Sequence, residues 1–365
     1  MKLQHPVQRL YALSIVHLKH VAQQFSDLKK VNQLTMRAAA VLFHERNDAN
    51  LGEIEIGEPG PEEVQVRTIA SFVSTGTERW ILTDRFSPSG TPYPCVPGYQ
   101  RVGIVTKVGA DIRDLQAGER VIATSGQWHG SISPYWGAHL EAANTHRSEI
   151  YRVPPAVEDA DAAGAVVAQV GYNAASRIAL SGQDWIVIYG DGIIGHCAAQ
   201  AARARGARTI LVGRRQQRLA LGAAFSADHI VDAGAGHVLQ QVMELTKGQP
   251  VTAILDTLQQ EAIQREYMPM LRPGAGQIVY CGHTTDKAWA DMTLLQAQGL
   301  TCHYVSDWTR ERIESTIALM SAGALKIAPL ITHRGTAEEA PGFYRMLLDN
   351  REPFLGILID WSKPR

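Results

Sequence analysis

The chain has 365 residues, of which 45% are apolar and 19% charged, and its 35 Lys and Arg nearly balance its 36 Asp and Glu. Such a composition is typical of a soluble globular protein, and the length favours two domains. The balanced charge argues against a nucleic-acid partner, and the lack of a long apolar run argues against a membrane span. The four cysteines are scattered without a C-x-x-C pair, which favours a reducing cytoplasm over a disulfide framework or a structural zinc site.

Residues 1–35 differ from the rest of the chain, because they carry five Lys or Arg residues against one Asp. Residues 7–34 could form an amphipathic helix. The apolar stretch at 10–18 is short and interrupted by His17, which argues against a signal peptide. We expect 1–35 to be a dispensable extension. A docked helix, an arm that binds a partner and a misassigned translation start are the alternatives.

From Met36 to about residue 158 the sequence predicts short strands separated by Gly/Pro turns. Strands are expected at residues 38–43, 64–70, 102–109 and 118–122. This spacing is typical of a compact, barrel-like β domain rather than of β-α-β units. After about residue 308, a helix at 310–322 and a last strand at 354–359 are expected to return to this domain.

Between residues 159 and 307 helices alternate with strands, and one helix is expected at 162–180. The centre of this region is a strand at 186–189, the turn Gly190-Asp191-Gly192-Ile193-Ile194-Gly195, an Ala-rich helix and a second strand at 209–212. This order predicts a doubly wound parallel sheet of the Rossmann type that binds a dinucleotide. Gly190 permits the tight turn, Gly192 lets the backbone approach a pyrophosphate on the helix N-terminus, and Gly195 lets the helix pack on the strand. A glycine turn that binds nothing is the alternative.

The end of the second strand indicates which dinucleotide binds. NAD-binding folds usually place a carboxylate about 20 residues after the glycines, where it holds a ribose hydroxyl. Here that position is Gly213, and Arg214 and Arg215 follow it. With no carboxylate to repel it, a 2′-phosphate could be gripped by two guanidinium groups. We therefore predict NADP(H); the alternative is two solvated surface arginines.

Further contacts with the cofactor are expected where other strands of this sheet end, because ligands bind at the carboxyl edge of doubly wound sheets. These positions are Asp256, Cys281, Gly282 and His283. A glycine at the end of a strand can equally serve only as a turn.

Several short motifs accompany this order of elements. They are Ser74-Thr75-Gly76-Thr77-Glu78, Pro97-Gly98-Tyr99-Gln100, Gly118-Glu119-Arg120-Val121, the V-G-Y-N-A-A run at 170–175 and Leu330-Ile331-Thr332-His333. Over about residues 36–361 the chain resembles the medium-chain dehydrogenase/reductase superfamily. S-T-G-T-E, P-Y-P-C-V-P-G-Y and the terminal I-D-W are similar to the branch that contains bacteriochlorophyllide (3-hydroxyethyl) dehydrogenase.

The resemblance implies an α/β fold with two domains after the extension. A GroES-like, β-rich catalytic domain would occupy 36–158 and be completed by 308–365, and a Rossmann domain would occupy 159–307. It also implies that the segment beginning at Val170 backs the nicotinamide ring. Because the superfamily often pairs its cofactor domains edge to edge, the resemblance allows a homodimer or a homotetramer.

The chain departs from the zinc alcohol dehydrogenases of this superfamily at their metal-binding positions. Those enzymes use a Cys in C-G-T-[DE], the His-Glu of G-H-E and a later Cys, where this chain has Thr75, Tyr99-Gln100 and approximately Val166. Catalytic zinc is typically held by three Cys, His or carboxylate ligands, which these side chains cannot supply. The lobe with four cysteines for a structural zinc is also missing, because no Cys lies between residues 95 and 197. The resemblance therefore implies a member of the family without zinc or another metal.

Without zinc, another group must stabilise the charge that hydride transfer creates on the substrate oxygen. Thr77 takes the place of the family's proton-relay hydroxyl, while Thr75, Tyr99 and Gln100 replace ligands and are expected to face the substrate. His129 and Tyr135, on the aromatic-rich loop at 125–136, are further candidates. The alternatives are that Tyr99 and Gln100 bond to each other and fill the vacated site, and that the two loop residues are surface residues.

Three functions for a small-molecule substrate remain open. The first is a zinc-independent oxidoreductase that transfers a hydride between NADP(H) and a carbonyl/alcohol or an activated C=C bond. The second, which the resemblance implies, is a tetrapyrrole hydroxyethyl dehydrogenase of the bacteriochlorophyllide type. The third is a non-catalytic NADPH-binding protein.

Overall fold

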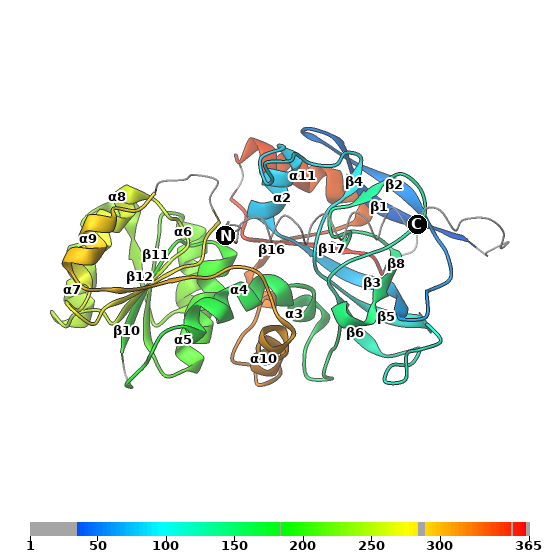
Figure 1. Ribbon diagram of the computed structural model, residues 1–365. Helices are drawn as coiled ribbons and strands as arrows, with labels where there is room; N and C mark the ends of the chain where they lie inside the picture. The colour runs from blue at the N-terminus through cyan, green and yellow to red at the C-terminus, as the bar shows by residue number, and fades with distance from the viewer. Residues whose placement is uncertain (1–34, 183, 284–288, 352, 363–365) are drawn as a thin grey trace, which may run out of the picture. The chain divides into compact units, whose positions relative to one another are not determined.

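The computed structural model describes residues 35–182, 184–283, 289–351 and 353–362. Residues 36–365 form one compact unit, which contains three β-sheets (Figure 1). The expected extension at 1–35 and its helix lie outside the described residues, apart from Thr35. The α/β fold class is confirmed.

Two of the sheets form the β-rich part of the chain. One is a four-stranded sheet with the order β2-β1-β4-β7, and the other has seven strands, with the order β16-β17-β3-β5-β6-β9 and β8 paired to β3. The strands are β1 (Met36–Glu45), β2 (Asp48–Ile56), β3 (Glu63–Val73), β4 (Cys95–Val96), β5 (Arg101–Val108), β6 (Arg120–Ala123), β7 (Ser133–Pro134), β8 (Ala142–His146), β9 (Ile150–Arg152), β16 (Ile331–Thr336) and β17 (Gly356–Asp360). All four strands expected from the sequence are present, in β1, β3, β5 and β6.

The end of the chain returns to this part as expected. Strand β17 pairs antiparallel with β3, and β16 pairs parallel with β17. In the sequence, helix α10 (Arg310–Ser321) precedes β16, helix α11 (Ala340–Asp349) lies between β16 and β17, and a short helix, α2 (Thr75–Leu82), follows β3. The burial pattern alternates in part along β2, whereas the six central residues of β1 are all buried, so both faces of β1 are covered there.

The third sheet has six parallel strands in the order β12-β11-β10-β13-β14-β15. They are β10 (Trp185–Tyr189), β11 (Arg208–Gly213), β12 (His229–Asp232), β13 (Ala253–Asp256), β14 (Gln277–Tyr280) and β15 (Thr301–Tyr304). The chain reverses its direction of travel across the sheet between β10 and β13. In doubly wound folds ligands bind at the carboxyl ends of the strands at this point. The predicted Rossmann sheet is confirmed.

The helices of this region differ from the prediction at one place, between residues 159 and 176. Those that connect the strands are α5 (Ile193–Ala204), α6 (Gln216–Leu221), α7 (Val238–Thr246), α8 (Glu261–Tyr267) and α9 (Met292–Ala297). The single helix expected at 162–180 is wrong, because the chain forms α3 (Asp159–Ala163) and α4 (Ala165–Ser176) with a break at Gly164. A Cβ at Gly164 would lie 3.0 Å from Ile327, and Asp161 accepts hydrogen bonds from the backbone N–H groups of Ile327 and Ala328. Packing against this later segment therefore decides where the helix breaks.

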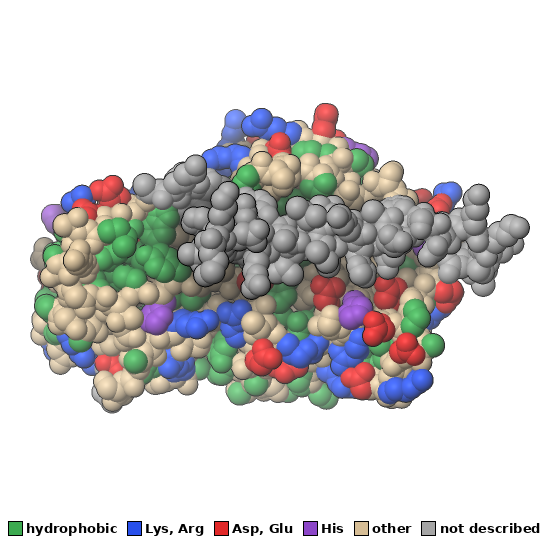
Figure 2. Space-filling view, viewed as in Figure 1, with side chains coloured by type: hydrophobic (Ala, Val, Ile, Leu, Met, Phe, Trp, Pro, Cys, Tyr) green, Lys and Arg blue, Asp and Glu red, His purple; other side chains and the backbone are tan. Residues whose placement is uncertain are grey.

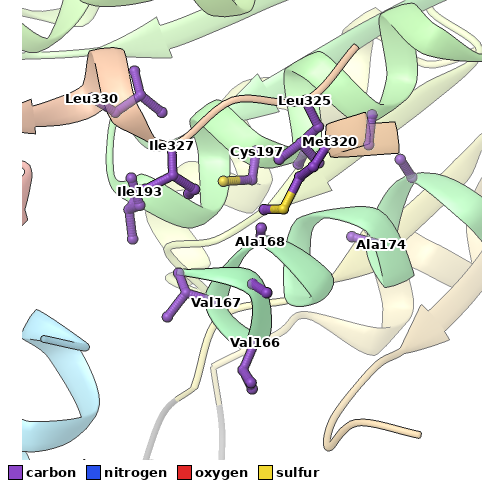
Figure 3. Packing of buried hydrophobic residues seen from close by; sticks show 14 of the residues in the cluster. Val166, Val167, Ala168, Ala174, Ile193, Cys197, Met320, Leu325, Ile327 and Leu330 are labelled. Carbon is purple, nitrogen blue, oxygen red and sulfur yellow. The ribbon is translucent and has the colours of Figure 1, made fainter. Parts of the chain in front are cut away.

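Small residues allow α4 and α5 to pack closely. A Cβ at Gly171 would lie 2.5 Å from the backbone nitrogen of Ala198, so no larger side chain fits there. Figure 3 shows aliphatic side chains of α4 meeting Cys197 of α5, Met320 of α10 and Ile327 in one buried cluster. Each fully buried aliphatic side chain of this kind contributes about 1.5–3 kcal/mol to folding. The cluster fixes the helix that begins at the glycine turn.

Charged side chains of both signs are interspersed over the visible part of the face in Figure 2. In the part of the chain that the structure describes, no helix combines the length and the apolarity needed to cross a membrane.

Candidate functional site

The turn between β10 and α5 contains three glycines, and only the second, Gly192, has open space beside it for a ligand. A Cβ at Gly190, whose φ is +114°, would lie 2.1 Å from Thr257 Oγ1, and one at Gly195 would lie 1.9 Å from the Gly190 carbonyl oxygen. A Cβ at Gly192 would meet nothing within 4 Å. Gly192 is also the N-cap of α5, and its helix has no side-chain cap. The N–H groups of Ile193 and Ile194 thus begin a helix without a capping side chain, and this arrangement fits a pyrophosphate.

Two substitutions in this turn should separate folding from binding. Gly195→Ala is expected to destabilise the fold, because the new methyl group would overlap a backbone oxygen that cannot move away. Gly192→Ala should leave the midpoint of urea unfolding nearly unchanged, since its Cβ enters open space, yet weaken dinucleotide binding by occupying that space. Urea unfolding and calorimetric titration with NADPH measure the two effects. Unchanged NADPH affinity in Gly192→Ala would contradict the placement of the pyrophosphate.

A carboxylate lies near Gly213 at the end of β11, so the expectation that none is present there is wrong. The carboxylate of Asp191 lies against this residue, since a Cβ at Gly213 would be 2.6 Å from Asp191 Oδ2. Oδ2 accepts hydrogen bonds of 2.8 Å from the backbone nitrogens of both Arg214 and Arg215. Oδ1 lies 3.4 Å from Arg218 Nη1 and 3.8 Å from Arg215 Nη1. The sequence could not reveal this contact, because the carboxylate comes from the preceding turn.

Nearby arginines balance the negative charge of Asp191. The Arg218 side chain is 11% exposed, and burial lowers its pKa while Asp191 opposes that effect. Arg214 is exposed, and among the described residues its guanidinium has no bonding partner. Three guanidinium groups and one carboxylate therefore leave a net positive charge at the end of β11. Asp191 holds the backbone of the two exposed arginines, and Arg214 is free to bind an anion.

The residues at the ends of β13 and β14 serve mainly in the fold. Asp256 is 1% exposed, and its Oδ1 accepts 2.8 Å hydrogen bonds from the backbone nitrogens of Leu258 and Gln259, while Oδ2 accepts one from Tyr267. Both carboxylate oxygens are thus occupied, so the Asp256 side chain is not free to bind a cofactor. The acid instead holds the turn after β13.

Of the three predicted residues that follow β14, Cys281 is buried and His283 is exposed. Cys281 is 2% exposed, its Sγ bonds to the Asp256 carbonyl oxygen, and burial raises its pKa, which argues against a cofactor contact through its side chain. A Cβ at Gly282 would lie 2.4 Å from the Thr257 carbonyl oxygen, so this glycine permits close packing. His283 is exposed, and burial of part of its ring lowers its pKa. Val170, which is half-buried in α4, and His283 remain accessible.

Three of the predicted catalytic residues, Thr75, Thr77 and Tyr99, lie at the start of α2 or contact it. Tyr99 donates a hydrogen bond of 2.5 Å to Ser74 Oγ, and Ser74 is the N-cap of α2. Burial raises the pKa of Tyr99 to about 12, and hydrogen bonds with the Ser74 and Thr77 side chains oppose that rise. Thr75 and Thr77, in the first turn of the helix, are half-buried. The structure therefore brings Tyr99 and Thr77 together, and adds Ser74, which the sequence analysis did not include among the site residues.

Gln100 bonds to backbone groups within the fold, which argues against its predicted contact with a substrate. The side chain is fully buried, its Oε1 accepts a 3.0 Å hydrogen bond from the backbone nitrogen of Val167, and its Nε2 donates to the Phe72 carbonyl oxygen. Tyr99 bonds to Ser74 instead, so the alternative of a mutual Tyr99–Gln100 bond is wrong. Val167 lies in the first turn of α4, where N–H groups have no partner within the helix. Gln100 thus joins the β-rich part to the helix beside the cofactor turn.

Replacing Gln100 with Leu is therefore expected to lower stability rather than to abolish chemistry at the site. The buried N–H of Val167 and the Phe72 carbonyl oxygen would both lose a partner, at a cost of about 1–3 kcal/mol each. A lower midpoint of urea unfolding with a kcat near that of the wild type would match this role. Normal stability combined with a large loss of kcat would instead indicate a contact with the substrate.

His129 contacts a different part of the β-rich region, and its catalytic role stays a prediction. Its backbone pairs with Glu55 of β2, and its ring packs on Gly57, where a Cβ would lie 2.2 Å from His129 Nε2. The side chain is otherwise exposed. Tyr135, from the same loop, is half-buried, and burial raises its pKa to about 12. Position in the loop alone could not distinguish the two residues, because the loop runs from β2 to the rings around Tyr99.

Aromatic rings surround Tyr99. Its ring stacks on Trp308 with 5.6 Å between the centroids and an angle of 25°, and it meets Trp136 edge-on at 5.2 Å. Trp308 comes from the segment before α10, so this contact joins two parts of the chain that are far apart in the sequence. Tyr99 is 7% exposed as a result.

The series of rings continues from Trp136 toward the cofactor sheet. Trp136 contacts Tyr135 at 5.1 Å and Phe86 at 5.8 Å between centroids. His283, at the end of β14, lies 5.1 Å from both Phe86 and Trp80 of α2. All of these rings are at least partly accessible. A series of aromatic rings therefore extends from the Tyr99 ring to the edge of the Rossmann sheet.

Metal ligands do not gather in the described part of the chain, where no three His, Cys, Asp or Glu side chains are close enough together to hold an ion. The positions that the resemblance linked to zinc have other partners. Tyr99 bonds to Ser74, Gln100 bonds to backbone groups, and Val166 is fully buried in the apolar cluster of Figure 3.

A Rossmann sheet with an uncapped glycine turn, next to a β-rich part that carries a buried tyrosine, defines a dinucleotide-binding protein with two functional parts. The model of the alcohol dehydrogenase GroES-like domain matches residues 60–155, and that of the family described as zinc-binding dehydrogenase matches residues 194–322. The chain belongs to the medium-chain dehydrogenase/reductase superfamily.

Individual relatives are similar over nearly their whole length. The 2-desacetyl-2-hydroxyethyl bacteriochlorophyllide A dehydrogenase of Cereibacter sphaeroides is 27% identical over 335 residues, which cover 89% of this chain and 99% of that protein. An Escherichia coli oxidoreductase/dehydrogenase of unknown specificity has the same fold, with a TM-score of 0.80, 18% identity and coverage of 89% and 99%. A putative zinc-binding dehydrogenase of Sinorhizobium meliloti, solved with NADP, has a TM-score of 0.76, 19% identity and the same coverage.

Proposed function

We propose that the protein is an NADP(H)-dependent oxidoreductase that acts on a carbonyl/alcohol or an activated C=C substrate without zinc. The observation that carries the proposal is the Tyr99 hydroxyl, held by Ser74 at the start of α2, on the ring surface that leads to the cofactor sheet. The sequence relatives named as dehydrogenases and the solved relative with bound NADP support it.

The residues present fit the cofactor. The open space at Gly192 and the uncapped start of α5 would hold the pyrophosphate, and Arg214 with Arg215 would hold the 2′-phosphate. The half-buried Val170 would face the nicotinamide ring. When bound, NADP(H) supplies or accepts the hydride.

Tyr99 would act as the proton donor. A tyrosine with a pKa of about 12 stays protonated at neutral pH. Its single proton, which is donated to Ser74 Oγ in the structure, would have to turn from Ser74 to the oxygen of a carbonyl substrate. Because an alkoxide is a stronger base than this phenolate, the proton moves from the Tyr99 Oη to the product oxygen during reduction. Thr77, in the same helical turn as Ser74, offers a second hydroxyl to that oxygen. At neutral pH the hydroxyl is therefore in the protonated form that a reduction requires.

Zinc would have no role in this chemistry. The side chains at the corresponding positions are hydroxyl, amide and aliphatic groups, which are poor ligands for Zn²⁺. Three of them, Tyr99, Gln100 and Val166, are also buried among partners of their own.

A second candidate function is favoured by the ring surface. The rings of Trp80, Phe86, Trp136 and Trp308 would suit a large planar substrate, which is the shape of a tetrapyrrole. The Cereibacter relative supports a dehydrogenase of hydroxyethyl side chains on such a ring. The homo-oligomeric state, the boundaries of the two domains and the cytoplasmic location stay predictions.

The proposal is tested by binding and turnover together. NADPH and NADH affinities are measured by calorimetry, and NADPH oxidation is then followed with a panel of aldehydes, quinones and enones. A hydroxyethyl chlorin with NADP⁺ is included, because its oxidation shifts the absorbance of the macrocycle. Turnover in the panel supports the first function, and turnover of the chlorin alone supports the second. NADPH binding without any turnover would support a non-catalytic protein and contradict both.

A further inference from the structure

A buried polar cluster lies beneath α2 and includes an acid that the sequence analysis did not assign to the site. Glu78, in α2, and His139, before β8, are both fully buried, and Glu78 Oε2 lies 2.9 Å from His139 Nε2. The same oxygen accepts a hydrogen bond of 2.5 Å from the hydroxyl of Tyr344 in α11. Burial raises the pKa of Tyr344 far above its ordinary value, and the charge of Glu78 adds to the rise. Buried carboxylates are costly unless fully bonded, so this cluster needs an explanation.

The partner of His139 Nδ1 indicates which ring nitrogen of His139 carries the proton that faces Glu78. His139 Nδ1 lies 2.8 Å from Ser71 Oγ, and Ser71 Oγ accepts a hydrogen bond of 2.8 Å from Trp361 Nε1. Because Ser71 already accepts from Trp361, its own proton is free for His139 Nδ1. Nε2 then carries the ring proton and donates it to Glu78.

The second carboxylate oxygen of Glu78 reaches the candidate active site. Glu78 Oε1 accepts a 2.8 Å hydrogen bond from the backbone nitrogen of Ser74. A serine at an N-cap ordinarily uses its own oxygen to accept an N–H of the first turn. Ser74 makes no such bond, and its Oγ accepts the proton of Tyr99 instead. Glu78 therefore fixes the backbone of Ser74, and this leaves the Ser74 hydroxyl oxygen to accept the hydrogen bond from Tyr99.

We propose that Glu78 is a positioning residue for Tyr99, held in place by His139 and Tyr344 and acting through Ser74. Its contacts come from α2, from the loop before β8 and from α11, so a carboxylate fixed at three points fixes the start of the helix. The effect on turnover rests on the proposed function, whereas the effect on the Tyr99 hydroxyl does not. Misplacement of a reacting group by about 1 Å can lower a rate by about 100-fold. A residue that holds the Tyr99 hydroxyl in place can therefore affect turnover without contacting the substrate.

The charge of Glu78 provides a measurable signal at Tyr99. Burial is the main cause of the raised pKa of Tyr99, and the negative charge of Glu78 raises it further, while Ser74 and Thr77 lower it. The rings of Trp136 and Trp308, which also face Tyr99, are uncharged. Removing the charge of Glu78 must therefore lower the pKa of the hydroxyl at position 99.

The experiment places a fluorotyrosine at position 99 of the full chain and follows its titration by fluorine NMR. Glu78→Gln removes the charge but keeps an oxygen for Ser74, so the fluorotyrosine pKa should fall by about one unit. Tyr344→Phe leaves the carboxylate with one donor fewer, so its field on position 99 should strengthen and the pKa should rise. Glu141→Gln is the matched control, because Glu141 also accepts a backbone N–H but is exposed, and it should cause no shift.

Opposite shifts in the two variants separate positioning from loosening of the fold, since general exposure of position 99 would lower the pKa in both. In chains that keep Tyr99, Glu78→Gln should lower kcat by about 10- to 100-fold with the NADPH Kd unchanged. If Glu78→Gln does not fold, the upward shift in Tyr344→Phe still tests the proposal. No shift in either folded variant would overturn it. Opposite shifts in a protein that turns over no substrate would keep the positioning role and reject the proposed function.

Discussion

Replacing Tyr99 with Phe is expected to lower kcat by about 10²- to 10⁴-fold, the contribution typical of a general acid. The hydroxyl is the proton donor in the proposed reaction, and its ring would keep the contacts with Trp308 and Trp136. The lost hydrogen bond to Ser74 should cost only about 0.5–1.5 kcal/mol of stability. Steady-state kinetics with NADPH and the substrate found in the panel measure the effect.

The control for this substitution is Tyr304→Phe, which removes an exposed hydroxyl at the end of β15. Its kcat should equal that of the wild type. NADPH affinity should be unchanged in both variants, because neither hydroxyl lies at the glycine turn. A Tyr99→Phe enzyme with the kcat of the wild type would remove Tyr99 as the acid and leave Thr77 as the candidate.

Replacing Arg214 with Ala is expected to weaken NADPH binding and to leave NADH binding unchanged. A hydrogen bond between charged groups contributes about 1.5–3 kcal/mol, so the NADPH Kd should rise by about 10- to 150-fold. Arg214 is the arginine whose guanidinium is free, while Arg215 and Arg218 lie near Asp191. Calorimetric titration of each variant with both cofactors gives the comparison.

Arg203→Ala is the matched control, because this arginine lies in the last turn of α5, where it pairs with Asp228. It should change neither affinity. Equal losses of NADPH and NADH affinity in Arg214→Ala would indicate damage to the turn rather than loss of a contact with the phosphate. Preferential binding of NADH by the wild type would show that Asp191 acts as the ribose-binding carboxylate, and the NADP(H) prediction would be wrong.

The regular parts of the fold could be predicted because local patterns determine them. The apolar run of β10, the glycine turn and the Ala-rich α5 each have a signature within one stretch of sequence. The break between α3 and α4 has no such signature, since it depends on Ile327 and Asp161, which are far apart in the chain. Tertiary contacts there decide an otherwise helical segment.

The candidate site was only partly predictable, for the same reason. Motif position placed Tyr99 and Thr77 near each other, but it could not show that Gln100 bonds to two backbone groups or that His129 packs on Gly57. The spacing of Ser74 and Glu78, one helical turn apart, was a usable signal for their bond. His139 and Tyr344 had no local signal, because the fold alone brings them to Glu78.

Asp191 lies against Gly213 although the two residues are 22 positions apart in the chain. The sequence placed no carboxylate at Gly213, yet the glycine turn brings one into contact with it. That carboxylate bonds to the backbone of the arginines that follow, so it organises the positive end of β11 instead of cancelling it. The prediction of NADP(H) therefore rests on the free Arg214 and on net charge, rather than on the absence of an acid.

Turnover and zinc content measured on the same samples test the proposed mechanism most directly. The purified protein is assayed with NADPH and its substrate before and after exhaustive chelation, and again after addition of Zn²⁺, with the metal bound per chain determined each time. We predict the same kcat in all three samples, with far less than one zinc per chain in the chelated one. A kcat that falls with chelation and recovers in proportion to bound zinc, up to one per chain, would contradict a site built on Tyr99.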